Sequence, residues 1–428
     1  MLVAKNKWPY CLGATDEYFV EPNSRKAVRE KMYNNTRTSR RPSLGRSRQG
    51  RFGRRNTSSS SNGVNQSLFI NKSEDLPVEL PYVSTHSFDD FGLNNQIVER
   101  VIRRGYVTPT PIQDQAIPFV MSGSDVIGLA DTGTGKTAVF LLPLIHRMLS
   151  DRSQKALIIV PTRELAVQID EELKEFAYGL PIYSAVCIGG NGYGHQDRSL
   201  QRRPQFIIGT PGRLKDHFER RTLHLNDVQN LVIDEADRLV DMGFIKDIRM
   251  LVGKLPINRQ TLFFSATMAP EVKDMVHSFL HSPQTISVKK RETSVNVDQD
   301  VIHFTDNFHK MTLLHELLGK DECKKVLIFG KTKHGVERLC DSLTERGFNA
   351  TSIHGNKSQS QRQRSLNEFK DNKTQILVAT DVAARGLDIP NVTHVINFDL
   401  PQSYGDYIHR IGRTGRADQK GKALTFVN

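Results

Sequence analysis

Short apolar segments alternate with longer, more polar segments along most of the chain, starting near Ser87. The apolar segments are of strand length and occupy residues 126–130, 156–162, 184–190, 206–211, 230–237, 261–267, 300–306, 325–332, 350–355, 375–381, 394–400 and 422–427. Apolar strands that alternate with helices are typical of parallel sheets covered on both faces. The alternation lapses across 288–296, which contains the charged sequence KKRETSVN. The pattern predicts an α/β fold of two tandem parallel-sheet domains, 86–287 and 297–428, joined by a linker at 288–296.

Residues 1–85 have a different composition. Between Arg37 and Arg55 there are eight arginines and no acidic residue, and a run of serines follows at 58–61. Residues 1–85 carry 15 basic and 7 acidic side chains, so +8 of the net charge of +12 lies there. A segment this poor in apolar residues cannot bury enough surface to offset chain entropy, so we predict a disordered basic extension.

This extension has two interpretations. It is either a solubilising tail or a tether that binds nucleic-acid phosphates without regard to sequence. The tether is favoured because the charge is carried by arginines interspersed with glycine, on a chain whose pI of about 9.5 already suggests a polyanionic partner.

The cysteines and the hydropathy pattern indicate the compartment. Cys11, Cys187, Cys323 and Cys340 show no C-x-x-C spacing, which favours a reducing compartment over a disulfide framework or a structural zinc site. No stretch approaches the ~18 uninterrupted apolar residues of a membrane span, and no apolar signal-peptide segment opens the chain. We therefore expect a cytoplasmic protein with no membrane segment.

The strongest chemical signal is the sequence ADTGTGKT at 130–137. A strand, a glycine-containing turn and a helix, in that order, form the context of a phosphate-binding loop. Gly133, Thr134 and Gly135 would let backbone N–H groups approach a polyphosphate, beside a positively polarised helix N-terminus. Lys136 would contact the β- and γ-phosphates, and Thr137 would bind Mg²⁺. A glycine-rich loop without a ligand is the alternative.

Carboxylates and hydroxyls follow two later apolar segments, in the sequences DEAD (234–237) and SAT (265–267). A phosphate loop requires one carboxylate to hold Mg²⁺ and an acid to orient the attacking water. Asp234 fits the first role and Glu235 the second, although an acidic helix start is the alternative. Ser265 and Thr267 are candidates to connect the magnesium site with the domain interface, unless they only cap a helix.

A candidate adenine-binding segment, GYVTPTPIQ, lies upstream at 105–113. Tyr106 would stack on the base and Gln113 would hydrogen-bond its edge. A proline-rich turn before a helix explains the same residues equally well.

The ordered set of motifs resembles the DEAD-box ATP-dependent RNA helicases of superfamily 2, and the compact core resembles the small bacterial members. The resemblance runs from about Phe88 to the C-terminus. It rests on GYVTPTPIQ, ADTGTGKT, PTRELA (161–166), GG (189–190), TPGR (210–213), DEAD, SAT, LIFGKT (327–332), HGNKSQSQR (354–362), ATDVAARGLD (379–388) and HRIGRTGR (409–416). It implies two RecA-like domains, ATP and Mg²⁺ as cofactors, and RNA as the partner. Asp131 departs from the pattern, because the family usually has glutamine there.

The resemblance also implies roles for individual residues. Arg413 and Arg416 would be arginine fingers that complete the ATP site, and Asp388 would lie at the ribose. RNA-backbone contacts are implied for Arg163, Gly190, Thr210, Arg213, Gln359, Arg362 and Thr380. Coupling between the ATP and RNA sites is implied for Asp237, Ser265, Thr267 and His409.

We therefore expect a monomeric, RNA-stimulated ATPase that unwinds short RNA duplexes or remodels RNA–protein complexes as its two domains close. Backbone contacts carry no base information, so RNA binding should be independent of sequence. One alternative is an ATP-gated RNA clamp with little turnover. Another is a translocating DNA helicase, which Gln113 and the DEAD sequence disfavour.

Overall fold

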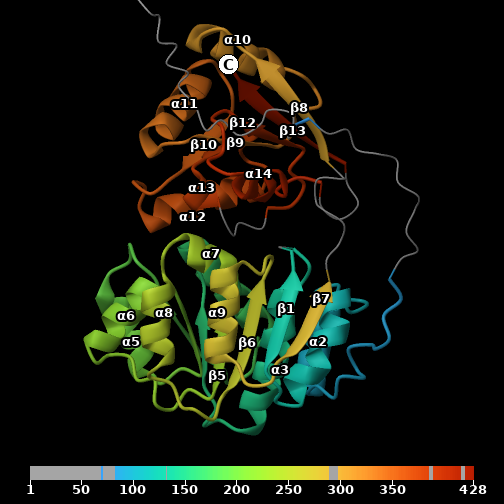
Figure 1. Ribbon diagram of the computed structural model, residues 1–428, viewed down its shortest axis with the longest axis vertical. Helices are drawn as coiled ribbons and strands as arrows, with labels where there is room; N and C mark the ends of the chain where they lie inside the picture. Colours follow the sequence, from blue (N-terminus) through green and yellow to red (C-terminus); the bar gives the residue numbers. More distant parts are fainter. Residues whose placement is uncertain (1–68, 71–81, 132, 289–296, 385–388, 416–419) are drawn as a thin grey trace, which may run out of the picture. The chain divides into compact units, whose positions relative to one another are not determined.

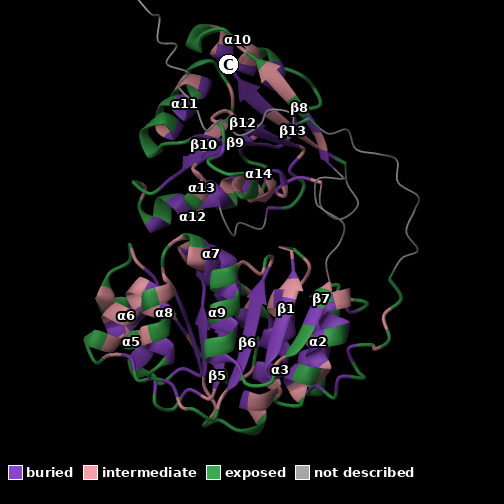
Figure 2. Ribbon diagram, viewed as in Figure 1, coloured by how far each residue is buried: buried purple, intermediate pink, exposed green. Residues whose placement is uncertain are grey.

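The chain folds around two parallel β-sheets, each with helices on both faces (Figure 1). The structure is a computed structural model that describes residues 69–70, 82–131, 133–288, 297–384, 389–415 and 420–428. Most of the inner strands of both sheets are buried throughout (Figure 2). The prediction of two α/β parallel-sheet domains is confirmed.

The first sheet has seven strands in the order β3-β4-β2-β5-β6-β1-β7. The pairs between neighbouring strands are all parallel. The strands are β1 (Val126–Ala130), β2 (Ala156–Ile159), β3 (Ser184–Cys187), β4 (Phe206–Gly209), β5 (Asn230–Ile233), β6 (Gln260–Ser265) and β7 (Gln284–Val288). The helices of this domain are α1 (Asn95–Arg103), α2 (Pro111–Met121), α3 (Lys136–Ser150), α4 (Arg163–Phe176), α5 (Tyr193–Gln201), α6 (Pro211–Glu219), α7 (Ala236–Asp241), α8 (Ile245–Val252) and α9 (Pro270–Phe279).

Both faces of this sheet are apolar because each faces a layer of helices. Successive strand residues point to opposite faces. Val126 of β1 therefore packs in one core with α1–α4, and Ile127 packs in the other core with α5–α9. This two-sided burial explains why the strands read as continuous apolar runs.

The second sheet has six strands in the order β10-β11-β9-β12-β13-β8, and its neighbouring strands are also parallel. The strands are β8 (Val297–His303), β9 (Val326–Phe329), β10 (Ala350–Ile353), β11 (Ile376–Ala379), β12 (His394–Asn397) and β13 (Gly421–Val427). The helices are α10 (Asn307–Leu318), α11 (Lys333–Glu345), α12 (Gln359–Lys370), α13 (Asp381–Ala384) and α14 (Tyr404–Ile411). Helices α10 and α11 share one core with this sheet, and α12 and α13 share the other.

The structure differs from the sequence prediction at both margins of the first domain. Strand β7 was not predicted, and its last residue, Val288, falls in the predicted linker. Strand β7 lies at the edge of the sheet, and Ile286 is its one buried residue. Its sequence, QTISV, therefore contains no apolar run that would predict a strand. The rest of the linker, 289–296, lies outside the described residues. Of the predicted disordered extension, residues 69–70 and 82–85 are described, and Phe69 is fully buried.

None of the helices in the described part of the chain combines the length and the hydropathy needed to span a bilayer.

Candidate functional site

Residues from three of the predicted motifs lie at the carboxyl ends of β1, β5 and β6, which are neighbours in the first sheet. Lys136 begins the helix after β1, Asp234 follows β5, and Ser265 ends β6. Ligands of open parallel sheets bind at this edge, because the loops and helix N-termini converge there. The three sequence motifs therefore form one site.

The loop before α3 depends on its glycines. Gly133 has a φ of 85° and Gly135 a φ of 86°, in the left-handed region that side chains disfavour. A Cβ at Gly135 would also lie 2.4 Å from Nε2 of Gln113. The Thr134 hydroxyl donates to the Asp131 carbonyl over 2.8 Å, which closes the turn. The turn thus leads directly into α3, with Gly135 as its N-cap, and a helix N-terminus is where phosphates bind.

Lys136 and Asp234 carry opposite charges and are both buried beside this loop. Lys136 is 7% exposed and donates from Nζ to the Ala130 carbonyl over 2.8 Å. Burial raises the pKa of Asp234, while the charge of Lys136 acts to lower it. The Glu235 backbone N–H donates to Oδ1 of Asp234 over 2.8 Å. Oxygen ligands are what Mg²⁺ prefers, and Asp234 provides carboxylate oxygens after β5.

Glu235 is held in place by a residue that the sequence interpretation missed. It has a φ of 51° as the N-cap of α7. Its Oε2 accepts a hydrogen bond from Nη1 of Arg238 over 2.6 Å, and both side chains are buried. A buried charge-assisted pair restricts the carboxylate to one orientation.

Asp237 joins the DEAD sequence to the SAT sequence. Its Oδ2 accepts hydrogen bonds from the backbone N–H groups of Ala266 (3.2 Å) and Thr267 (3.0 Å) and from the Thr267 hydroxyl (3.2 Å). Ser265 Oγ accepts from the Asp237 N–H over 3.3 Å and donates to the Thr267 carbonyl over 2.7 Å. Three of the four predicted coupling residues therefore form one network.

Gln113 is fully buried and has both ends of its amide bonded to backbone. Its Oε1 accepts from the Thr110 N–H over 3.0 Å, and its Nε2 donates to the Gly135 carbonyl over 3.0 Å. Thr110 Oγ1 donates to the Thr134 carbonyl over 2.9 Å. In the structure Gln113 thus connects the start of α2 with the phosphate loop.

Tyr106 lies in an aromatic group that also includes residues the sequence interpretation did not single out. Its ring packs edge-on against Phe88 (centroids 6.3 Å apart, 82°) and against Phe176 (5.9 Å, 65°). The Arg104 guanidinium lies 6.0 Å from the Tyr106 ring centroid.

Arg163, the first residue of α4, packs against the backbone of Gly189 and Gly190. A Cβ on Gly190 would lie 2.3 Å from Nη1 of Arg163, and one on Gly189 would lie 3.0 Å from its Nη2. Gly190 also has a φ of 85°. The absence of side chains at Gly189 and Gly190 therefore leaves space for the Arg163 guanidinium after the end of β3.

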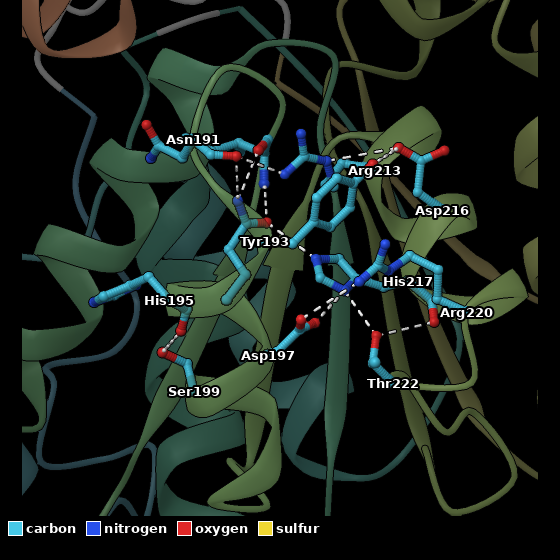
Figure 3. Close-up of polar contacts among 12 residues, drawn as sticks. Asn191, Tyr193, His195, Asp197, Ser199, Arg213, Asp216, His217, Arg220 and Thr222 are labelled. Atoms are coloured by element: carbon cyan, nitrogen blue, oxygen red, sulfur yellow. Dashed lines mark hydrogen bonds and ion pairs between the residues drawn. The ribbon is translucent and has the colours of Figure 1, made fainter.

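Arg213 of α6 lies over the ring of Tyr193 of α5 (Figure 3). Its guanidinium and that of Arg220 each lie 4.2 Å from the centroid of the Tyr193 ring. Arg213 Nη1 donates to the Asn191 carbonyl over 2.9 Å, and the Tyr193 hydroxyl donates to Oδ2 of Asp216 over 3.0 Å. These contacts place Arg213 beside the loop that carries Gly190.

A buried pair, Gln196 and His217, supports the same loop, and Figure 3 shows His217 of this pair. Gln196 Nε2 donates to the Ile188 carbonyl (3.0 Å) and its Oε1 accepts from the Ile188 N–H (3.1 Å). Because that oxygen accepts, His217 donates to it through Nε2 over 3.1 Å, and the Thr222 hydroxyl lies 2.8 Å from Nδ1. Burial lowers the pKa of His217, partly opposed by the charge of Asp197.

The second domain carries its predicted RNA residues at one sheet edge. Thr380 follows β11, and Gln359 and Arg362 lie in the first turn of α12, which follows the neighbouring β10. On the first domain, Thr210 is the N-cap of α6.

The sequence HRIGRTGR contains α14 residues and the turn after them. Arg413 is 3% exposed, and its Nε donates to the His409 carbonyl over 3.3 Å. Arg410, which we did not single out, pairs with both carboxylate oxygens of Asp381 (2.6 and 2.8 Å) and donates to the Asp399 carbonyl. The predicted residues Asp388 and Arg416 lie outside the described residues.

Comparison with known proteins decides the family. The DEAD/DEAH box helicase family matches residues 110–275, and the helicase conserved C-terminal domain matches residues 309–418. The ATP-dependent RNA helicase CshA of Listeria monocytogenes is 46% identical over 342 residues, which cover 79% of this chain and 66% of that protein. The DEAD-box ATP-dependent RNA helicase CshA of Bacillus subtilis is 44% identical over 349 residues, covering 80% of this chain and 70% of that protein. This chain belongs to the DEAD-box family of ATP-dependent RNA helicases.

Solved DEAD-box structures extend the likeness to the fold. S. cerevisiae Dbp5 bound to RNA and ADP BeF3 is similar at 31% identity with a TM-score of 0.71, covering 80% of this chain and 89% of that chain. Mss116p bound to ssRNA and AMP-PNP is similar at 30% identity with a TM-score of 0.72, covering 81% of this chain and 76% of that chain. The two sheet domains are therefore RecA-like domains. The chain spans about two thirds of the length of its CshA relatives.

The residues of this DEAD-box protein that support the site but were missed at the sequence level include Phe88, Gln196, Arg238, His217 and Arg410. Arg238 directly follows DEAD, and Arg410 lies inside HRIGRTGR, so proximity to a motif was an available signal for both. His217 had no such signal, because a histidine on a helix is more often an ordinary surface or core residue.

Proposed function

We propose that this DEAD-box helicase hydrolyses ATP when RNA joins its two domains, and that the cycle unwinds short RNA duplexes or remodels RNA–protein complexes. The observation that carries the proposal is the buried group of Lys136, Asp234 and Glu235 at one sheet edge. Burying three charges is costly unless they are paired and used together. Phosphoryl transfer needs charges that are positioned in this way.

The residues around the phosphate loop would each contact a different part of the bound ATP, its Mg²⁺ or the attacking water. The loop N–H groups and the start of α3 would bind the phosphates, and Lys136 would exchange its bond to the Ala130 carbonyl for a phosphate oxygen. Asp234 and Thr137 would hold Mg²⁺, which would neutralise charge on the β- and γ-phosphates when bound. Glu235, restrained by Arg238, would orient the attacking water.

RNA binding and ATP hydrolysis would be linked in two ways. Asp237 would pass changes at the ATP site to the SAT sequence through its hydrogen bonds to Thr267. Arg413, with Arg416, would reach the ATP only after domain closure, which makes hydrolysis conditional on RNA that contacts both domains. RNA contacts from Arg163, Arg213 and the start of α12 would involve the backbone, and so would not depend on sequence.

We also propose that the protein acts as a monomer in the cytoplasm, because every motif of both half-sites lies in one chain. The basic extension would add phosphate contacts with the same RNA.

A steady-state ATPase assay with and without single-stranded RNA tests this proposal. RNA should raise turnover about tenfold or more, and Lys136→Ala should abolish it. Lys324→Ala, which alters an exposed lysine, is the matched control and should behave as wild type. Stimulation below about twofold would instead support an ATP-gated clamp. Equal stimulation by single-stranded DNA of the same length would contradict the assignment to RNA.

A further inference from the structure

One aromatic residue that precedes the first domain in the sequence is buried against the second domain. Phe69 has 0% of its surface exposed and belongs to a small core with Val297, Tyr407, Ile411 and Ala423. The rings of Phe69 and Tyr407 lie 4.6 Å apart between centroids, with 58° between their planes. A side chain from outside the domain therefore completes part of that domain's core.

The pocket around Phe69 is built from three elements of the second domain. Val297 comes from β8, the edge strand of the sheet, and Ala423 comes from its neighbour β13. Tyr407 comes from α14, and its hydroxyl donates to Oε1 of Gln299 on β8 over 2.9 Å. Burial raises the pKa of Tyr407, so the hydroxyl remains a donor. The pocket thus fixes one face of α14 to the sheet edge.

The opposite face of α14 carries His409, the first residue of HRIGRTGR, whereas Ile411 of the same sequence faces the pocket. Tyr407 and Ile411 are four residues apart, so they lie on one face of the helix. At about 100° per residue, His409 lies roughly 200° around the axis from Tyr407. Arg413, just after the helix, donates to the His409 carbonyl over 3.3 Å. A shift of α14 would therefore move the groups that present Arg413.

We propose that Phe69 is an in-chain ligand of this pocket, and that its binding fixes α14 in the orientation that presents His409 and Arg413. The chemical class that the pocket takes is an aromatic side chain. A close-packed interior holds its elements in place through such contacts, and an empty pocket would remove the aromatic contact between Phe69 and Tyr407 from the back of α14. The catalytic consequence rests on the proposed role of Arg413, but the effect on α14 does not.

The occupation of the pocket is an equilibrium that can be shifted. A single ring on a chain segment is held by much less surface than a helix of the domain, so it opens more readily. The neighbouring Ile70 is 57% exposed, and it offers a matched control one residue away.

Hydrogen exchange of the full-length protein tests the proposal without ATP or RNA. In Phe69→Ala, the amides of α14 (404–411) should exchange roughly tenfold faster, while those of α3 in the first domain stay unchanged. Ile70→Ala should change neither helix. Adding an excess of a synthetic peptide of residues 62–76 should restore protection of α14 in Phe69→Ala, and the same peptide with alanine at position 69 should not.

The ATPase readout is separate. At saturating RNA, kcat of Phe69→Ala should fall about three- to tenfold with KM for ATP within about twofold, because the change acts on the presentation of Arg413. Unchanged exchange of α14 in Phe69→Ala would overturn the proposal, whatever the ATPase result. If Phe69→Ala does not fold, Phe69→Leu decides: exchange of α14 about threefold faster than in wild type supports the proposal, and identical exchange contradicts it.

Discussion

Glu235 combines a strained backbone with a fixed side chain. A non-glycine residue in the left-handed region costs about 1–3 kcal/mol, and such strain persists only where the surroundings enforce it. Here the surroundings are Arg238 on its carboxylate and Asp234 on its backbone N–H. The sequence predicted Asp234 and Glu235 from the motif alone. It could not predict the pair with Arg238, because a spacing of three on a helix is equally typical of exposed ion pairs.

Glu235→Gln should abolish hydrolysis and leave ATP binding largely intact. The amide cannot accept a proton from water and loses its charge toward Arg238, so a decrease of about 10²–10⁴ in kcat is expected. Single-turnover hydrolysis and nucleotide binding measure the two effects separately. Glu219→Gln, at an exposed glutamate, serves as the control. Near-normal turnover in Glu235→Gln would contradict the role assigned to Glu235.

Asp114, next to Gln113, anchors the segment that leads into the first domain. Its carboxylate accepts from the Tyr82 hydroxyl (2.5 Å) and from the backbone N–H groups of Thr85 (2.8 Å) and His86 (3.0 Å). Burial acts to raise the pKa of Asp114, but these hydrogen bonds outweigh it and lower the pKa to about 2. The stability that they provide is therefore present above the usual pKa near 3.8 and is lost as the pH falls towards 2.

Asp114→Asn should destabilise the protein by about 1–3 kcal/mol at pH 7, because an amide NH₂ would face donors and leave them unsatisfied. The difference from wild type should shrink as the pH is lowered from about 4 towards 2. Urea denaturation at several pH values measures this, with Asp89→Asn at an exposed site as the control. A difference that does not change with pH would refute the linkage.

At the scale of elements, the sequence predicted the strands with long apolar runs and missed one edge strand, β7. Strands such as β2 and β5 are buried at every position, so their apolar runs are unambiguous. Strand β7 has a single fully buried residue, Ile286, and therefore gives almost no hydrophobic signal. Gln196 of α5 and His217 of α6 support the loop that carries Gly190. This could not be predicted from the sequence either, because the two side chains meet only in the tertiary fold.

Gln196→Ala should weaken RNA binding through the loop that carries Gly190. Both backbone groups of Ile188 would lose their partner, and an unsatisfied buried group costs about 1–3 kcal/mol. We expect about a tenfold higher Kd for RNA, with ATP affinity of the first domain unchanged. Fluorescence anisotropy with labelled RNA measures this, and Gln201→Ala at the exposed end of α5 is the control. An unchanged Kd would show that the loop is held by other contacts.

At the scale of the whole molecule, the motifs fall on two domains and the excess charge falls ahead of both. Most of the positive charge of the extension lies before residue 62. A deletion that stops at residue 61 therefore removes the charge but keeps Phe69 in the chain.

Deletion of residues 1–61 should lower RNA affinity and flatten its dependence on salt, because fewer counterions are released on binding. ATPase turnover at saturating RNA should be unchanged. RNA binding across a salt series measures the slope. If RNA affinity depends on salt equally in the full-length and the shortened protein, the extension is a solubilising tail and not a tether.

The central claim is that two half-sites, one on each domain, form the ATPase only when RNA brings them together. The most direct test is ATP turnover of Arg413→Ala as a function of RNA concentration, alongside its affinity for ATP. We predict that ATP binding remains largely intact while RNA-stimulated turnover falls by about 10³-fold or more, as for arginine fingers elsewhere. Turnover that still rises with RNA as in the wild type, or an equal loss of ATP binding and hydrolysis, would contradict the claim.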